Sequence, residues 1–436
     1  MATAAPAADC RRRAVLSTTL SRTSAAFLFL SVVVVGAVAS ARWITSTTTR
    51  RRPSPARSHP PLHPALPHPI PTPSPSAAAS NNNSCPSYFR FIHEDLRPWR
   101  AAGGITRAML DRAGLTATFR LVVLGGRAYV QRLRPAFQTR DLFTIWGVLQ
   151  LLRRYPGRVP DFELMFDCVD WPVVRTHLYR GEFAKIMPPL FRYCGDDSTL
   201  DIVFPDWSFW GWPEINIKPW DALLQDLKDG NNRVRWLDRE PYAYWKGNPS
   251  VSVTRQELVK CNVSSTQDWN ARIYNQDWFK EGKAGFKDSD LSNQCAHRFP
   301  FSSLTDSIKY AVDWGNSHKK LAQRIGKQAS NFIQEELSMD HVYDYMLHLL
   351  TEYAKLLKFK PTKPPEAVDI CSESLACQAE GLEKKFLLES MVKSASDTGP
   401  CDLPPPFGAH ELTMLKQRKE NSIKQIEMWE QGASKS

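Results

Sequence analysis

The stretch 161–172 reads DFELMFDCVDWP and places a strand at the centre of the predicted fold. Its apolar residues alternate with others, as in a β-strand, at Phe162, Leu164, Phe166 and Cys168. The strand is expected to end at Asp170, because Pro172 cannot donate a ladder hydrogen bond and closes the run. Asp170 is thereby expected at the carboxyl end of a strand.

The segments before this strand predict a hairpin and a helix. Residues 118–133, TFRLVVLGGRAYVQRL, read as two strands joined by the two-residue turn Gly125-Gly126. After a candidate cap at Thr139, apolar residues recur at helical spacing at Leu142, Trp146, Leu149 and Leu152. Pro156 ends that run. Strands that alternate with helices predict an α/β fold, in which functional groups gather at the carboxyl ends of strands.

Asp170 has two interpretations at this stage. Its place after a strand makes it a candidate functional carboxylate. Alternatively, it caps the turn before Trp171-Pro172, because Asp side chains often bind nearby backbone in turns.

The charge of the chain is concentrated at its start. The formal charge is +11 over 436 residues, but residues 1–84 hold nine Arg, no Lys and one acidic residue. The rest is nearly neutral, so the folded part lacks the basic cluster that nucleic-acid binding needs. The length leaves room for two or three domains.

The N-terminal region has the layout of a membrane anchor and a stem. Residues 1–22 are an Arg-rich tail, and 23–41, TSAAFLFLSVVVVGAVASA, are 19 uncharged and mostly apolar residues that can span a bilayer. A cleaved signal peptide is the rival, since 39–41 (Ala-Ser-Ala) resembles a cleavage site. Residues 42–84 include ten prolines between 53 and 75 and are expected to form an extended stem.

Cysteines and glycosylation sequons point to an oxidising lumen. Eight of the nine cysteines lie from Cys85 onward without zinc-type spacing, which favours disulfides over a metal site. Asn82 and Asn262 each begin an N-x-Ser sequon. We therefore expect a protein of the Golgi or endoplasmic reticulum membrane with its C-terminal part in the lumen.

Two further stretches are candidate binding elements. The loop 201–220 gathers Trp207, Trp210 and Trp212 between prolines, and these rings could either stack on sugars or fill a core. In YWKGNPSVSVTRQELVKC, a Lys-Gly-Asn-Pro loop precedes a capping box formed by Thr254 and Glu257. A helix that starts at Thr254 would offer free N–H groups to a phosphate, although this stretch by itself favours an ordinary capped surface helix.

Several enzyme classes lack support. The chain has no Walker loop, no G-x-G-x-x-G, no H-E-x-x-H and no G-x-S-x-G. A glycoside hydrolase would need two carboxylates across one cleft, and nothing in the sequence identifies such a pair.

Five motifs together resemble a known family. They are CPSYFRFIHEDLRPW from Cys85, DFELMFDCVDWP, DIVFPDWSFWGWPE, YWKGNPSVSVTRQELVKCN and SIKYAVDWGNSHKK. In these motifs the chain resembles the plant Rumi-type protein O-glucosyltransferase homologues, which belong to the lipopolysaccharide-modifying and capsule-associated glycosyltransferase family. The resemblance runs from about Cys85 to the C-terminus.

The resemblance implies an α/β fold of the GT-B type with two Rossmann-like halves. It also implies a UDP-sugar donor, no metal, inversion at the sugar carbon, and a protein or polysaccharide acceptor. In the animal relatives the acceptor is a serine hydroxyl on EGF repeats. Asp170 matches the strand-end Asp of the family and is the expected base. Lys246, Gly247, Asn248 and Arg255 lie where the family has its donor loop, which favours a diphosphate site there.

One departure from the family lies after Arg298. The family continues there into a strand, a helix and another strand, whereas this chain passes through FPFSSLTD directly to Ser307. About 40 to 50 residues, the size of one βαβ unit, are expected to be missing from the donor half. The rival hypothesis to an enzyme is therefore a non-catalytic lumenal module that binds glycan or protein.

The expected organisation follows from these segments. The parts are a cytosolic tail at 1–22, an anchor at 23–41, a stem at 42–84, an acceptor-side half at 85–235, a donor-side half at 236–360, and C-terminal loops with a helix at 361–436.

Overall fold

The computed structural model describes residues 83–285 and 304–433. By its contacts the chain divides into 1–76 and 77–436, and the described residues all lie in the second unit. The predicted tail, the anchor and nearly all of the stem lie outside the described residues. No helix within the described ranges is both long and apolar enough to cross a membrane.

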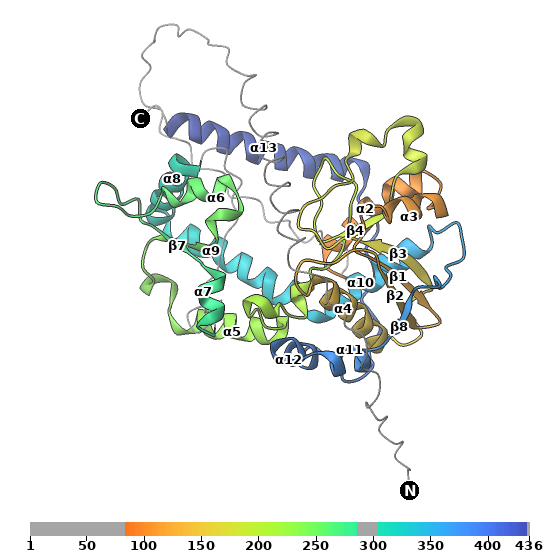
Figure 1. Cartoon of the computed structure of the whole chain (residues 1–436). Helices are drawn as coiled ribbons and strands as arrows, with labels where there is room; N and C mark the ends of the chain where they lie inside the picture. Colours follow the sequence, from red (N-terminus) through yellow and green to blue (C-terminus); the bar gives the residue numbers. More distant parts are fainter. Residues whose placement is uncertain (1–82, 286–303, 434–436) are drawn as a thin grey trace, which may run out of the picture. The chain divides into compact units, whose positions relative to one another are not determined.

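The described elements are helices and strands interspersed along the chain (Figure 1). The strands are β1 (Phe119–Leu124), β2 (Arg127–Arg132), β3 (Phe162–Phe166), β4 (Leu190–Arg192), β5 (Ile202–Val203), β6 (Ala243–Gly247), β7 (Ala271–Asn275) and β8 (Val368–Ile370). The longer helices are α2 (Phe91–Ala101), α3 (Arg107–Ala113), α4 (Arg140–Arg154), α5 (Trp220–Arg233), α8 (Leu304–Ser317), α9 (Lys319–Asn331), α10 (Met339–Ala354) and α13 (Ala409–Ala433). Shorter ones are α6 (Val253–Val259), α7 (Trp278–Lys283), α11 (Ser372–Gln378) and α12 (Gly381–Glu389).

Strands β5-β4-β3-β1-β2-β8, in that order, form the main sheet. The predicted hairpin is confirmed, with Gly125 at φ 54° and Gly126 at φ 76° between β1 and β2. Two successive positive φ values match the right-handed twist of the strands, and glycine adopts them without a steric penalty.

The main sheet is mixed, which differs from a wholly parallel Rossmann-like half. Strand β3 pairs antiparallel with β1, whereas β3, β4 and β5 pair in parallel. A two-residue turn can join only antiparallel strands, so the hairpin imposes the antiparallel pairing of β1 with β2. The parallel part carries the carboxyl end of β3, where Asp170 follows.

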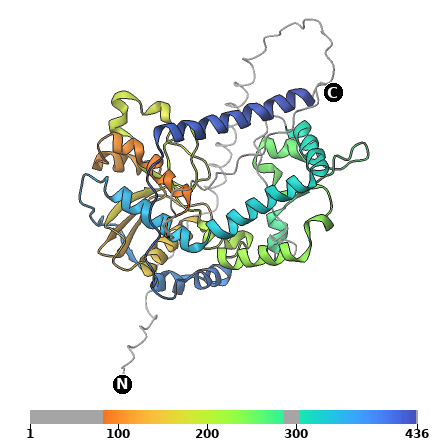
Figure 2. The same cartoon turned by 180° about the vertical axis from the view of Figure 1, so that it is seen from behind.

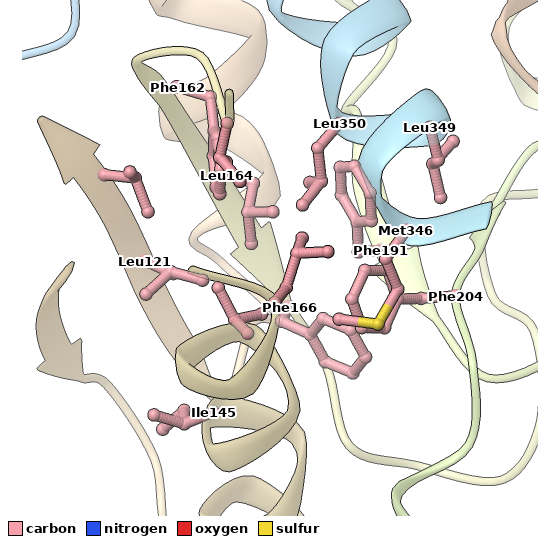
Figure 3. Close-up of a cluster of buried hydrophobic side chains, with 14 of the residues drawn as sticks. Leu121, Ile145, Phe162, Leu164, Phe166, Phe191, Phe204, Met346, Leu349 and Leu350 are labelled. Atoms are coloured by element: carbon pink, nitrogen blue, oxygen red, sulfur yellow. The ribbon is translucent and has the colours of Figure 1, made fainter. Parts of the chain in front are cut away.

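Both faces of β3 are buried. Phe162, Leu164 and Phe166 face the main core, to which α4 and α10 contribute Ile145, Met346 and Leu350 (Figure 3). The opposite face presents Met165 to a second cluster that includes Leu110 of α3. Helices on both faces explain why every residue of this strand is buried, the charged Glu163 included.

Elements from the C-terminal half of the chain complete the main sheet. Helix α10 lies within the predicted donor half, 236–360, but it packs on β3, and Tyr353 donates a hydrogen bond to the Glu163 carbonyl at 3.0 Å. Strand β8 pairs with β2. The predicted terminal helix is confirmed as α13, a long helix (Figure 2) that contacts α8 and pairs Glu411 with Arg90.

The second sheet consists, within the described ranges, of β6 and β7 in parallel. It covers a small core of Cys261, Ala271 and Ile273. Arg298, after which the family unit is expected to be missing, lies outside the described residues.

Burial of an acid on α2 predicts a pH-dependent stability. Burial raises the pKa of Asp95 to about 7, with Glu94 adding to the rise and the Val203 N–H opposing it. The unfolded carboxyl ionises near pH 4, so between about pH 4 and pH 7 the unfolded state loses a proton that the folded state keeps. The contribution of Asp95 to the free energy of unfolding is therefore fully present below pH 4, and it falls by about 3 kcal/mol as the pH rises to 7.

Asp95→Asn removes this titration and is expected to be more stable than the wild type at pH 8 but not at pH 4. Urea unfolding of both proteins at the two pH values measures the difference. An equal difference at both values would contradict the raised pKa.

Candidate active site

The strand β3 ends at Phe166, earlier than predicted, so Asp170 lies four residues beyond it; the Asp170 carboxylate is accessible. Its side chain is 56% exposed, although both of its oxygens are held by Arg140. Arg140 Nη1 donates to Oδ1, and Nη2 donates to Oδ2 at 3.1 Å. Such a bidentate pair fixes the orientation of a carboxylate while leaving its other lone pairs available.

Arg140, which holds Asp170, is a residue of this candidate site that the sequence did not single out. It is the first residue of α4, its side chain is 7% exposed, and its Nη1 also donates to the Cys168 carbonyl at 3.2 Å. Its guanidinium lies 4.3 Å from the centroid of Trp207 and 5.0 Å from that of Phe137. Aromatic faces and one carboxylate therefore hold this cation.

Trp207 and Trp210 lie in the core. Trp207 is buried under Arg140 and packs edge-on against Trp212 at 5.0 Å. Trp210 is fully buried, and its Nε1 donates to the Tyr343 hydroxyl at 3.0 Å. Neither ring has a face free for a sugar in this structure. Trp212 is partly exposed, and its Nε1 donates to Gln138 at 2.8 Å. Of these three rings, it is the one that is still open enough to stack on a sugar as predicted.

Two other aromatic rings near Asp170 are open to solvent. Trp171, the next residue in the chain, is 62% exposed, and Phe137, beside Arg140, is 65% exposed. By contrast, the thiol of Cys168 is buried, which raises its pKa to about 12. A buried thiol of this kind does not serve as a nucleophile.

The predicted donor residues gather at the carboxyl end of β6. Lys246 lies 3.4 Å from Glu281, and both side chains are largely buried. Gly247 ends the strand, and a Cβ there would lie 2.6 Å from the Trp245 ring, so only glycine fits. Asn248 accepts a hydrogen bond on its carbonyl from Arg255 Nη1 at 3.3 Å. The structure thus brings together Gly247, Asn248 and Arg255, on a different sheet from Asp170.

The helix after this loop starts earlier than predicted. Helix α6 begins at Val253, and Ser252 is its N-cap, with its hydroxyl accepting from the Arg255 N–H at 3.3 Å. Thr254 lies inside the first turn, and Glu257 pairs with Lys260. The predicted capping box of Thr254 and Glu257 is therefore wrong, because Ser252, two residues before Thr254, caps the helix.

The two predicted glycosylation sites differ in what the structure says of them. Asn82 lies outside the described residues. The Asn262 carboxamide donates to the Ile273 carbonyl at 3.1 Å and accepts from the Ile273 N–H at 3.0 Å. This reciprocal pair continues the backbone pairing of β7, which gives Asn262 a structural role.

The described cysteines include one disulfide. Cys85 and Cys401 are joined, with their Cα atoms 5.0 Å apart. His348 lies close enough to both sulfurs to form a candidate metal-ligand group with them. Sulfurs joined to each other are not thiolates, and a metal binds thiolates, so this group holds no metal while the disulfide is intact.

Known proteins have sequences similar to that of this chain. The pattern of the family described as Glycosyl transferase family 90 matches residues 80–304 and 297–430. The O-glucosyltransferase rumi homolog of Anopheles gambiae is 23% identical over 354 residues, covering 67% of this chain and 84% of that protein. Protein O-glucosyltransferase 1 of Homo sapiens is 22% identical over 346 residues, covering 65% and 83% respectively. The family matches span most of the chain, which therefore belongs to glycosyltransferase family 90.

Proposed function

We propose that this glycosyltransferase moves glucose or xylose from a UDP-sugar to a hydroxyl of a protein or glycan acceptor, with inversion and without a metal. The observation that carries the proposal is the accessible Asp170 carboxylate, held in place by the buried Arg140 at the carboxyl end of β3. A fixed carboxylate open to solvent on one side suits a general base.

The proposed reaction is a single displacement. Asp170 takes the proton of the acceptor hydroxyl, and the hydroxyl oxygen forms a bond to the anomeric carbon of the donor sugar. The bond from that carbon to the diphosphate breaks at the same time, and UDP leaves with the electron pair. Attack opposite to the leaving group inverts the sugar carbon.

The departing diphosphate needs positive charge. Arg255, in the first turn of α6, supplies a cation beside the backbone of Gly247 and Asn248, and Lys246 lies on the strand that ends at Gly247.

Trp171 and Phe137 are the proposed contacts for the acceptor. Both are exposed aromatic side chains next to members of the Asp170–Arg140 pair. Aromatic faces of this kind pack against sugar rings and apolar side chains. Together with the partly exposed Trp212, they replace the buried Trp207 and Trp210 in that role.

We further propose that the chain works in the lumen of the Golgi or endoplasmic reticulum, anchored through residues 23–41. The Cys85–Cys401 disulfide supports an oxidising compartment.

UDP-sugar binding tests the donor site. Arg255→Ala is expected to weaken the binding of UDP-glucose or UDP-xylose about tenfold or more, because removing a charge-assisted contact costs about 1.5–3 kcal/mol. Isothermal titration of the full chain measures the effect. The matched control is Arg239→Ala, an exposed arginine outside the loop that is expected to bind normally. Equal binding by all three proteins would contradict the donor site.

A non-catalytic binding module is the second candidate. The family match falls into two segments, 80–304 and 297–430, which overlap at 297–304. The donor half is expected to be shortened near this point, and a shortened donor half favours the second candidate. A folded full-length chain that neither binds nor hydrolyses a UDP-sugar would establish this candidate over the enzyme.

A further inference from the structure

A buried arginine lies behind the Asp170 loop. Arg192 ends β4, and it lies between two carboxylates that are buried with it. Its Nη2 donates to Asp167 Oδ2, and its Nε is 3.7 Å from Asp201 Oδ1. Asp167 directly follows β3, and Asp201 directly precedes β5.

Asp201 holds the chain that leaves Asp170. Its two oxygens accept the Val173 N–H at 3.1 Å each, and Oδ2 also accepts the Val174 N–H at 3.0 Å. The Leu200 N–H donates to the Val174 carbonyl at 2.8 Å, which aligns the two segments. The backbone is therefore fixed three residues after Asp170.

Asp167 holds the chain that enters Asp170. Its own N–H donates to the Phe191 carbonyl at 3.0 Å, and its Oδ1 accepts from the Thr118 hydroxyl at 3.4 Å. The same hydroxyl accepts the Cys168 N–H at 3.0 Å. The backbone is therefore also fixed two residues before Asp170.

The burial of Arg192, Asp167 and Asp201 is not explained by a gain in stability. Nε and Nη1 of Arg192 are buried and have no hydrogen-bond partner among the residues that the structure describes. Burial also raises the pKa of Asp201, against the opposing effect of the Val173 and Val174 N–H groups. Buried ion pairs of this kind are often no more stabilising than apolar residues of the same volume. The clearer effect of this group is therefore on the position of the backbone around Asp170.

We infer that Asp201, paired with Arg192 together with Asp167, is a positioning residue that fixes the backbone on the C-terminal side of Asp170, while Asp167 fixes the N-terminal side. The catalytic consequence rests on the proposed function, whereas the fixing of the backbone does not. Arg140 orients the Asp170 carboxylate itself, whereas Asp201, Arg192 and Asp167 hold the backbone of the loop that carries Asp170.

The test compares Asp201→Ala and Asp201→Asn with Asp344→Asn in the full chain. Asp344 is a matched control, because it is an equally buried acid whose Oδ1 and Oδ2 accept from the Tyr155 hydroxyl and the Cys401 N–H, away from the loop. Amide hydrogen exchange of the segment 171–176, read by mass spectrometry, reports on the backbone. The kcat and KM for UDP-sugar report on catalysis.

We expect exchange in 171–176 to rise tenfold or more in Asp201→Ala and less in Asp201→Asn, which keeps one acceptor. The kcat should fall in the same order, by about 100-fold and about tenfold, with KM for UDP-sugar unchanged. Asp344→Asn should lower the melting temperature without changing exchange in 171–176 or kcat.

Unchanged exchange in folded Asp201→Asn overturns the inference. Faster exchange with an unchanged kcat in an active enzyme overturns the catalytic part of it. If the wild-type chain transfers no sugar, the proposed function fails, and the exchange result still decides whether Asp201 fixes the loop.

Discussion

Asp170→Asn is expected to lower the rate of sugar transfer by about 10²–10⁴-fold, the usual contribution of a general base. Asparagine has nearly the same shape and keeps one acceptor for Arg140, but it cannot take the acceptor proton. Binding of the UDP-sugar should be unchanged, because the donor residues lie on the other sheet. The decrease should therefore appear in kcat.

Steady-state kinetics of the full chain with UDP-glucose or UDP-xylose measure this prediction. Asp161→Asn is the matched control at the opposite end of β3, where the carboxylate accepts from the Gly125 N–H at 2.7 Å. A melting curve of each variant separates loss of catalysis from loss of folding, since the substitution leaves the charge of Arg140 without its partner. If Asp170→Asn turns over normally, Asp170 is not the base.

Loss of the Cys85–Cys401 disulfide is expected to lower the free energy of unfolding by about 5 kcal/mol. The bond closes a loop with a sequence separation of 316 residues, and the entropy that a cross-link removes from the unfolded chain grows with loop length. Backbone hydrogen bonds beside it, from Cys85 N–H to Asp402 at 3.0 Å and from Asp402 N–H to Asn83 at 2.7 Å, should loosen with it.

Denaturant unfolding of the double variant Cys85→Ser, Cys401→Ser measures the loss. The control is Cys371→Ser, because serine can replace the exposed Cys371 as N-cap of α11. A reductant should destabilise the wild type and the control but not the double variant. Equal stability of all three proteins without reductant would contradict the prediction.

Local patterns predicted the elements around Asp170 well. The hairpin at Gly125-Gly126, the helix after Thr139 and the strand of 161–172 all depend on spacing and turn chemistry within a few residues. The alternation extended the strand to Asp170, whereas β3 ends at Phe166 and Asp170 lies in the loop that follows.

Contacts between distant segments could not be predicted in this way. Arg140 precedes Asp170 by 30 residues, and the available signal was an arginine at the start of an apolar helix, which many helices have. The loop around Trp207 and Trp210 fitted both a core and a sugar platform, and its burial depends on Tyr343 and Arg140. Composition alone does not contain that information.

Caps illustrate a second limit. Thr254 and Glu257 matched a capping pattern, yet Ser252 caps the helix. Thr139 stands at the start of α4 as predicted, but its hydroxyl donates to Glu214 at 3.0 Å and does not cap the helix. Where several hydroxyl residues lie within one turn, tertiary contacts select the one that is used.

The completion of the main sheet by β8 and the Cys85–Cys401 bond has a consequence for biosynthesis. A ribosome adds on the order of 5–20 residues per second, so Cys401 emerges on the order of tens of seconds after β1. Until then the nascent chain exposes the unpaired edge of β2 and holds a lone thiol at Cys85. The first half made is therefore among the last to mature, because its sheet edge waits for β8 and its thiol waits for Cys401.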